Sequence, residues 1–437
     1  MLGPLVAGWS CLVCGKHVDV AEPLVWRCPN ASVDDPHHAL QIVQHIVPLR
    51  GGNDANPFVA FRPYLAWDGF AAAHGMTDEA RDAMIQQVDA DVTAVAGIGF
   101  HVTPFERADA LSDSLGFSAD GGVWVKDETA QVAGSHKARH LVTILLHILT
   151  VESMGLAPWS RAADRPPLAI ASCGNAAYAA AALAAAVKWP LRVFVPPHAD
   201  PVVLARLDEL GAEIAACARR DADPPGDPCM HRFREAVAAG AIPFTVQGTE
   251  NAWCLDGGRT IGWEMARYIE EEVVGPPLDR LFVQVGAGTF AASAISGFRM
   301  SGVMPRLHAV QTDSCAPLQR AWLKTADIGG PAEAAKHWGE CMWPWEHVGA
   351  SAADGILDDE TYDWIPVVRA MVDGDGSPIV VTEEQVLRAN ELGRATTGID
   401  ASHTGTAGLA GLMAVMDQVD PAERVAVIFS GVSRVAR

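Results

Sequence analysis

The sequence predicts an α/β protein built on parallel sheets, and three observations carry this prediction. Short runs rich in β-branched residues recur along the chain, among them VWVKDE, PLAIAS, LRVFV, IPFTVQG, LFVQV, RLHAVQTD and RVAVIF. Segments rich in Ala, Leu and Glu separate these runs, and strands that alternate with helices form parallel sheets covered on both faces. An apolar fraction of 49% over 437 residues provides cores for two large domains or about three smaller ones.

The N-terminal stretch carries three closely spaced cysteines. Cys11 and Cys14 form a C-x-x-C that the turn residue Gly15 follows, and Cys28 ends the strand-like run PLVWRC. A zinc ribbon begins in this way, but its second half is broken because Ala31 occupies the position of the fourth cysteine. The residues that could replace this ligand are His17, His37 and His38. With three sulfurs in place, we favour a metal-free, degenerate ribbon over a structural zinc on Cys11, Cys14 and Cys28.

Helices are expected to precede the alternating part of the chain. The stretches FRPYLAWDGFAAAHG and TDEARDAMIQQVDADVTAVAG predict a helical lead-in between residues 56 and 120, with Thr77 as an N-cap. Further along, the acidic and glycine-bearing stretch 352–376 predicts an excursion on the surface.

Charge and cysteine content exclude several classes of protein. The 32 Lys+Arg against 53 Asp+Glu give a formal net charge of -21, which would repel nucleic acids and anionic lipids. The N-terminus lacks a basic start, and the longest alanine-rich run is interrupted at Lys188 and Pro190, so we expect no signal peptide and no membrane span. The cysteines are nine, an odd number, which favours reduced thiols in a cytoplasmic protein.

Two loops at the starts of helices offer a nucleophile and an anion site. Lys137 follows the turn G-S-H and begins an apolar helix, where the helix dipole favours the neutral amine that a covalent nucleophile needs. Taken alone, it could be an ordinary surface lysine. The second loop ends the strand PLAIAS and opens an alanine-rich helix whose N–H groups could bind a carboxylate, or could simply be capped. Its residues are Ser172, Cys173, Gly174, Asn175 and Ala176.

Two further loops suit a phosphate and a heterocyclic ring. The loop after LFVQV combines small residues with a helix start, as phosphate cradles do, and consists of Gly286, Ala287, Gly288, Thr289 and Phe290. The same letters spell G-x-G-x-x-A, and Asp313 closes the next predicted strand, which is also the pattern of a dinucleotide fold. Ser430 ends the run RVAVIFS and could bond a ring nitrogen without protonating it.

Taken in order, these loops resemble those of fold-type II pyridoxal-phosphate enzymes, most of all threonine synthase, over about residues 61–430. The motifs that carry the resemblance are T-P-F at 103–105, V-K-D-E at 125–128, G-S-H-K at 134–137, S-C-G-N at 172–175, L-D-G-G-R-T-I at 255–261 and G-A-G-T at 286–289. The resemblance implies two parallel-sheet domains with the cofactor between them. We expect a ribbon-like extension at 1–55, a large cofactor-binding domain from 56–125 and 255–437, a smaller α/β domain at 126–254, and a homodimer.

The resemblance also implies a role for each loop. Lys137 would hold pyridoxal phosphate covalently and then remove the α-proton of the substrate. The loop from Gly286 to Phe290 would hold the phosphate, Asn175 the ring 3-oxygen, and Ser430 the ring nitrogen. The carboxylate of a small amino-acid substrate would lie on the loop from Ser172 to Ala176.

The sequence departs from threonine synthase at several positions. His136 replaces a phenylalanine before the lysine, which makes the motif closer to that of the tryptophan synthase β chain, and Ala138-Arg139-His140 replaces Asp-Arg-Gly. Ala287 interrupts the glycine run, and residues 398–405 lack the family's Glu and Pro. His136 could act as an acid or base, although we favour a packed neighbour. Arg139 could bind an anionic substrate group or solvate its helix.

The leading interpretation is a pyridoxal-phosphate dependent carbon–oxygen lyase or synthase of threonine-synthase type. It would catalyse elimination or replacement at the β- or γ-carbon of a small amino acid. The alternatives are a threonine or serine dehydratase, an NAD-dependent oxidoreductase based on the G-x-G-x-x-A loop and Asp313, and a non-catalytic binding protein that keeps the fold.

Overall fold

The larger sheet has six strands in the order β12-β11-β10-β13-β5-β4, in a computed structural model that describes residues 5–32, 34–272, 277–302 and 304–434. Its strands are β4 (Phe105–Arg107), β5 (Gly122–Asp127), β10 (Arg280–Gln284), β11 (Arg306–Thr312), β12 (Ser377–Val381) and β13 (Arg424–Phe429). Neighbouring strands are parallel except β4, which pairs antiparallel with β5. Because Asp127 is paired with Phe429, the segments after β5 and β13 leave the sheet side by side.

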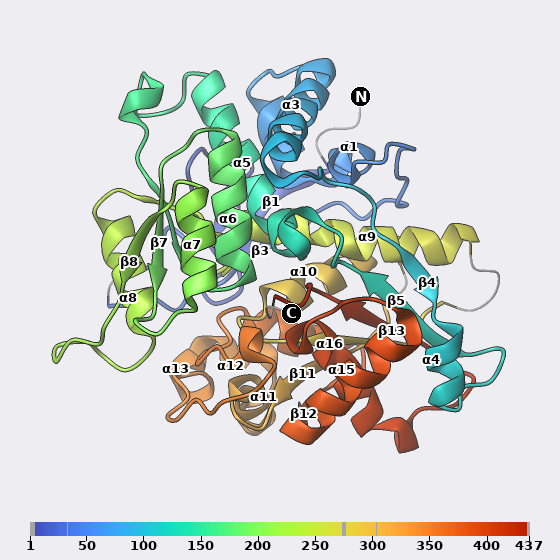
Figure 1. The fold of residues 1–437 in the computed structure, drawn as a ribbon. Coiled ribbons are helices and arrows are strands. Elements are labelled where there is room, and N and C mark those ends of the chain that lie inside the picture. Colours follow the sequence, from blue (N-terminus) through green and yellow to red (C-terminus); the bar gives the residue numbers. More distant parts are fainter. Residues whose placement is uncertain (1–4, 33, 273–276, 303, 435–437) are drawn as a thin grey trace.

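The smaller sheet is parallel throughout, in the order β8-β7-β6-β9. Its strands are β6 (Leu168–Ala171), β7 (Leu191–Val195), β8 (Glu213–Ala216) and β9 (Ile242–Pro243). Figure 1 shows it at the left, with the larger sheet at the lower right. The fold class predicted from the alternating pattern is therefore confirmed.

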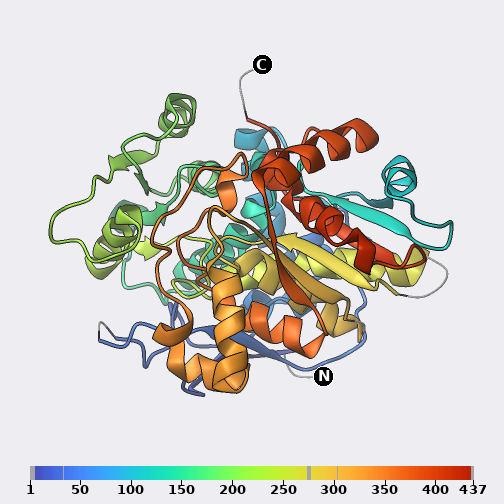
Figure 2. The ribbon, with the colours of Figure 1, turned by 90° about the horizontal axis from the view of Figure 1, so that it is seen from below.

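Helices cover both sheets, as the view from below also shows (Figure 2). The helices that lead into the sheets are α1 (Pro57–Ala60), α2 (Ala66–Ala73), α3 (Asp78–Ala96) and α4 (Asp109–Ser114). Those of the smaller sheet are α5 (Lys137–Ser153), α6 (Asn175–Ala186), α7 (Pro201–Glu209) and α8 (Pro228–Ala238). Those that follow are α9 (Cys254–Glu272), α10 (Thr289–Phe298), α11 (Pro317–Ile328), α12 (Pro331–Ala334), α13 (Trp338–Cys341), α14 (Trp364–Asp373), α15 (Glu383–Thr397) and α16 (His403–Ala414).

Two apolar cores lie on opposite faces of the larger sheet. One contains buried residues of β13 and α16, such as Val427 and Leu409, while the other joins α5, α9 and α10 to the N-terminal region. Thr77 caps α3 as predicted, because its hydroxyl accepts a hydrogen bond from Ala80 N–H at 3.3 Å. Within the described ranges, no helix is both long and apolar enough to cross a membrane.

The N-terminal extension is a small antiparallel sheet of β1 (Val6–Cys11), β2 (His17–Asp19) and β3 (Leu40–Gln44), with β1 in the middle. It packs on the body through aromatic rings. Trp9 of β1 is buried edge-on against Trp253, with ring centroids 5.2 Å apart.

The prediction of a surface excursion at 352–376 is wrong. Much of this stretch is buried, and it contains α14, whose apolar face includes the buried residues Trp364, Val368 and Met371. These apolar residues have helical spacing, but the acidic residues that precede them made the whole stretch resemble an exposed segment. The structure also adds β8 and β12, which lacked a long apolar run, and reduces the predicted strand IPFTVQG to Ile242–Pro243.

Candidate active site

The four loops singled out from the sequence converge between the two sheets. Backbone hydrogen bonds join the lysine turn to the segment after β13, from His136 N–H to Ser430 O at 3.1 Å and from Val432 N–H to Gly134 O at 2.9 Å. The Phe290 ring lies 3.9 Å from the His136 ring, centroid to centroid. A Cβ atom built on Gly431 would lie 2.7 Å from Asn175 Nδ2. Residues far apart in the sequence thus form one site.

Lys137 begins α5 directly after a tight turn. Ala133 and Gly134 both have left-handed backbone angles, with φ of +57° and +66°, and a Cβ on Gly134 would lie 2.6 Å from Val432 Cγ1. The side chain of Lys137 is half-buried. Burial lowers its pKa, while the carboxylate of Asp358 acts in the opposite direction. The neutral amine expected from the helix dipole is therefore favoured mainly by desolvation.

His136 and His140 form a buried pair behind the lysine. His136 Nδ1 lies 3.2 Å from His140 Nε2, and His140 Nδ1 lies 2.9 Å from the carbonyl oxygen of Cys254. Because that carbonyl only accepts, we infer that His140 donates from Nδ1 and accepts from His136. Burial lowers the pKa of His140 to about 3 and that of His136 well below its usual value. His136 is thus a neutral, packed residue next to Lys137.

Arg139 has neither of the roles expected from the sequence, because it lies in a buried charge network. Its Nε donates to Glu128 at 2.8 Å, and its other nitrogens reach Glu264 of α9. Lys126 Nζ also donates to Glu264. The two cations balance the two carboxylates and join β5, α5 and α9. Burial would raise the pKa of Glu264, yet Arg139 and Lys126 hold it below its usual value.

The loop from Ser172 to Ala176 connects β6 to α6, and α6 begins at Asn175. Arg434 Nε donates to Asn175 Oδ1 at 2.7 Å, and the guanidinium lies over the Tyr178 ring at 4.2 Å from its centroid. With its oxygen engaged by Arg434, Asn175 keeps its Nδ2 hydrogens as donors. No sequence motif pointed to Arg434, because it follows the last predicted strand.

The loop from Gly286 to Phe290 is a tight cradle between β10 and α10. Gly288 has a φ of +93°, and a Cβ on it would lie 2.9 Å from Thr361 Cγ2. The Thr289 hydroxyl donates to Asp363, whose carboxylate also accepts from Gly248 N–H at 2.8 Å. The side chain of Thr289 is therefore committed to Asp363. The first N–H groups of α10 have no partner within the helix, which is the arrangement that binds phosphate.

Asp358 is an acidic residue that lies against this cradle. A Cβ on Gly286 would approach its Oδ2 to 2.1 Å, so only glycine fits there. Burial, with Asp359 and Asp227 adding to it, raises the pKa of Asp358 to about 6, and Lys137 opposes the shift. Desolvation and then the carboxylates of Asp354, Asp227 and Asp358 raise the pKa of the Cys173 thiol. Carboxylates therefore lie near both the cradle and the Cys173 loop.

Ser430 is buried at the end of β13. Its hydroxyl oxygen accepts from Gln284 Nε2 at 2.5 Å, and its backbone N–H donates to Gly405 O at 3.2 Å. Because the amide supplies a hydrogen to Ser430 Oγ, the serine's own hydrogen is free to point elsewhere.

Comparison with known proteins identifies the family. The sequence pattern of the family described as "Pyridoxal-phosphate dependent enzyme" matches residues 98–431. The chain belongs to this family. The family resemblance expected from the loops and the cofactor, pyridoxal phosphate, are thereby confirmed. Asp313, which motivated the dinucleotide alternative, is exposed at the end of β11.

Several relatives of this pyridoxal-phosphate dependent enzyme have names that refer to different reactions. A threonine synthase from Methanosarcina acetivorans is 23% identical over 324 residues, which cover 72% of this chain and 70% of the relative. The processed form of threonine deaminase isoform 2 from Solanum lycopersicum superposes with a TM-score of 0.59 and 16% identity, over 90% of this chain and 96% of that one. Maize serine racemase superposes with a TM-score of 0.58 and 17% identity, over 80% and 92% of the two chains.

The residues present fit pyridoxal phosphate. The glycine loop would hold the phosphate by the N–H groups at the start of α10, and the loop stays tight because a Cβ at Gly286 or Gly288 would clash with Asp358 or Thr361. Lys137 would hold the aldehyde carbon, while Asn175 and Ser430 would face the ring oxygen and the ring nitrogen.

The sequence did not point to Asp358 and Asp363. Both residues belong to the acidic run D-D-E-T-Y-D at 358–363, whose composition predicts an exposed segment, and only the fold places this loop over the cradle.

Proposed function

We propose that this chain is a lyase that removes an uncharged or cationic group from the β-carbon of a small amino acid. The observation that carries the proposal is the juxtaposition of Lys137, whose neutral amine is favoured by burial, with Asp358 and its carboxylate neighbours. When bound, pyridoxal phosphate supplies the electron sink for the negative charge that develops at the α-carbon.

Lys137 would hold the cofactor covalently, and its amine would then accept the α-proton of the substrate. A neutral amine is required for both tasks, and desolvation of Lys137 lowers its pKa in that direction. The substrate carboxylate binds the N–H groups at the start of α6, a helix of 12 residues. The Ser430 hydroxyl would donate to the ring nitrogen and would leave it unprotonated, which would favour elimination over transamination.

Asp358 holds the proton that the leaving group needs. Its pKa of about 6 leaves a fraction of the carboxyl protonated near neutral pH, and Lys137 is one of the charges that act on it. A hydroxyl or an amine leaves more readily once it is protonated. General acid catalysis of this kind contributes about 10²- to 10⁴-fold to a rate.

The negative surroundings disfavour a phosphate leaving group. Asp227, Asp354 and Asp358 all act on Cys173, in the loop that would receive the substrate. A phosphate ester of the substrate would add a second multiply charged group beside the cofactor phosphate in this partly desolvated region, where like charges repel strongly. This supports a dehydratase-type elimination over replacement at a phosphorylated γ-carbon.

The test compares substrates that differ in their leaving group. Purified enzyme is incubated with L-serine, L-threonine, 2,3-diaminopropionate or O-phosphohomoserine, and the 2-oxo acid, ammonia and inorganic phosphate formed are measured. We expect 2-oxo acid and ammonia from at least one of the first three compounds, and no phosphate from the fourth. In Asp358→Asn, kcat should fall about 10²- to 10⁴-fold, whereas the exposed control Asp313→Asn should keep it.

Replacement of the threonine-synthase type is the second candidate, because a threonine synthase matches 72% of the chain. Phosphate release from O-phosphohomoserine with formation of threonine would support this candidate and contradict the proposal. Interconversion of L- and D-serine without 2-oxo acid would contradict both candidates and favour a racemase.

A further inference from the structure

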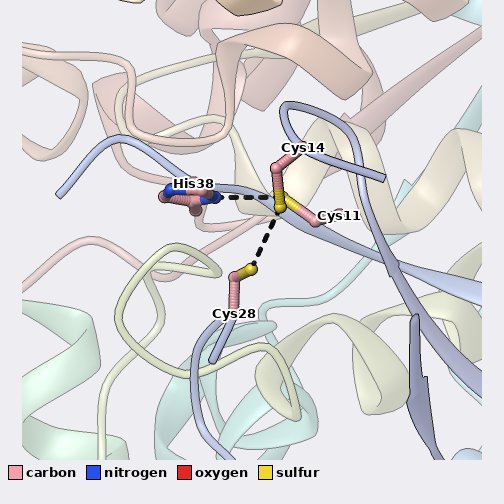
Figure 3. A group of neighbouring side chains, drawn as sticks. All are labelled: Cys11, Cys14, Cys28 and His38. Carbon is pink, nitrogen blue, oxygen red and sulfur yellow. Dashed lines mark hydrogen bonds between the residues drawn. The ribbon is translucent and has the colours of Figure 1, made fainter. Parts of the chain in front are cut away.

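Four potential metal ligands meet beside the end of β1 in the N-terminal sheet. The ligand atoms of Cys11, Cys14, Cys28 and His38 all lie within 4.8 Å of one another, and Figure 3 shows the side chains directed toward a common point. Cys11 Sγ lies 3.3 Å from His38 Nδ1, and Cys14 Sγ lies 3.6 Å from Cys28 Sγ. A tetrahedral zinc with Zn–S of about 2.3 Å and Zn–N of about 2.0 Å requires ligand separations of roughly 3.5–3.8 Å.

The backbone around the ligands has the shape of a metal knuckle. Gly15 follows the C-x-x-C with φ of +71°, and its N–H donates to Cys11 O at 3.0 Å. Asn30 Nδ2 donates to Cys14 Sγ at 3.4 Å, which would stabilise a thiolate. Cys11, Cys28 and His38 are no more than 4% exposed.

The second ring nitrogen of His38 supports a role as a ligand. His38 Nε2 lies 3.2 Å from a carboxylate oxygen of Asp35, while Nδ1 faces the cysteines. A carboxylate that accepts from one nitrogen fixes the proton there and leaves the other nitrogen with a free lone pair. Metal-ligating histidines are commonly oriented by such a carboxylate.

The same knuckle holds a segment that packs on the body near the active site. Two carbonyls of the chain between β2 and Cys28 accept hydrogen bonds from the body. Trp26 O accepts from Ala252 N–H at 2.8 Å, and Val25 O accepts from Trp253 Nε1 at 3.0 Å. Trp253 directly precedes α9, and the carbonyl of the next residue, Cys254, accepts from His140. Bound metal would therefore hold in place the segment that contacts Trp253, next to the Cys254 carbonyl that positions the histidine pair behind Lys137.

We propose that these three cysteines and His38 bind one Zn²⁺ in a structural site. Three thiolates and one imidazole in tetrahedral arrangement are a donor set that zinc favours, and four protein ligands leave no open position for catalysis. His38 thus supplies the fourth ligand in place of the cysteine that the ribbon pattern would have at position 31, where this chain has Ala31. The inference is independent of the reaction at Lys137.

The test measures zinc bound to the full-length holoenzyme by inductively coupled plasma mass spectrometry. We expect one zinc per chain in the unaltered protein and in His17→Ala, whose histidine is exposed on β2. His38→Ala should lose the metal, whereas His38→Cys should retain it because a fourth thiolate completes the site. Asp35→Asn should bind zinc about 10- to 100-fold more weakly in competition with a chelator.

Several outcomes would overturn the proposal. Unaltered protein that contains no zinc and takes up none from solution would do so, and so would His38→Ala that keeps a full equivalent. A metal-free protein whose intact mass is two hydrogens below that of the thiol form, and returns to it on reduction, would indicate a Cys14–Cys28 disulfide in place of the metal. His38→Cys and Asp35→Asn keep the test decisive if His38→Ala fails to fold.

Discussion

At the scale of single residues, burial and a neighbouring carboxylate shift the pKa of Lys137 in opposite directions. Burial lowers it, and the Asp358 carboxylate raises it. The balance decides at which pH the amine becomes available to the cofactor. Asp358 therefore influences the pKa of Lys137 and is also the proposed proton donor. The first role is measured by covalent capture of the cofactor and the second by kcat.

Asp358→Asn should make Lys137 lose its proton at lower pH. The change removes a negative charge that stabilises the ammonium, so the pKa of the lysine should fall. The readout is the rate at which stripped enzyme recaptures added pyridoxal phosphate covalently, followed by absorbance across pH. The acid limb of this profile should move to lower pH in Asp358→Asn and stay in place in Asp313→Asn. An unmoved limb in both variants would show that Asp358 does not act on Lys137.

Ser430→Asp should change the product distribution. A carboxylate against the ring nitrogen raises the pKa of that nitrogen and strengthens the ring as an electron sink, so side transamination should increase at the expense of elimination. Ser430→Ala should be milder, because it loses only a hydrogen bond worth about 1 kcal/mol. The ratio of the two products is measured by chromatography. If both variants keep the original ratio, Ser430 does not face the ring.

At the scale of elements, the position of α5 depends on buried charges. Arg139 and Lys126 meet Glu128 and Glu264 with no net charge, and this network joins α5 to β5 and α9. Charges of this kind are costly to bury, so the complete set must be retained. The network fixes the first turn of α5, where Lys137 lies.

Glu264→Gln should lower the stability of the fold by about 3–5 kcal/mol, since it leaves two buried cations with one carboxylate. Thermal unfolding of the holoenzyme, monitored by circular dichroism, checks this. The control is Asp164→Asn, which breaks the exposed pair with Arg161 and should leave the transition unchanged. Equal transitions for Glu264→Gln and the unaltered protein would mean that the network does not anchor α5.

At the scale of the whole molecule, a buried neutral histidine links the N-terminal extension to the body. The His147 ring stacks on Trp253 with centroids 3.9 Å apart, and its Nε2 accepts from Leu24 N–H at 3.2 Å. Burial lowers the pKa of His147 to about 3. Below the usual histidine pKa the unfolded chain takes up a proton that the folded chain does not, so stability falls as pH falls.

His147→Gln should flatten the acid side of the stability profile. Between about pH 6.5 and pH 3, one such histidine contributes a slope of about 1.4 kcal/mol per pH unit. Unfolding in urea at several pH values in this window measures the slope. The exposed residue His198 gives a control, because His198→Asn should keep the slope of the unaltered protein. A slope that is the same in all three proteins would contradict the buried, neutral state of His147.

Much of the architecture could be predicted because local signals agree with the fold. The runs that became β5, β6, β7, β10, β11 and β13 are rich in β-branched residues, and each is followed by a turn or a helix start. The glycine loops and Lys137 were recognisable because their chemistry depends on neighbours in sequence. β8, with its sequence EIAA, lacked such a signal.

The rest of the site depends on contacts between distant residues. Arg139 and Glu264 are separated by 125 positions, and nothing in either motif indicates that they pair. Asp358 reads as solvent-exposed in an acidic stretch, yet it lies against Gly286 because the loop folds over the cradle. His38 was one of three candidate ligands, and only the fold of the extension distinguishes it from His17 and His37.

The assignment of Lys137 is tested most directly by identifying the lysine that carries the cofactor. Purified enzyme is reduced with borohydride and digested, and the peptides are analysed by mass spectrometry. We expect a pyridoxyl group on the peptide that contains Lys137 and its loss in Lys137→Ala. A pyridoxyl group on Lys126, Lys188 or any other lysine, or none in protein that binds pyridoxal phosphate, would contradict it.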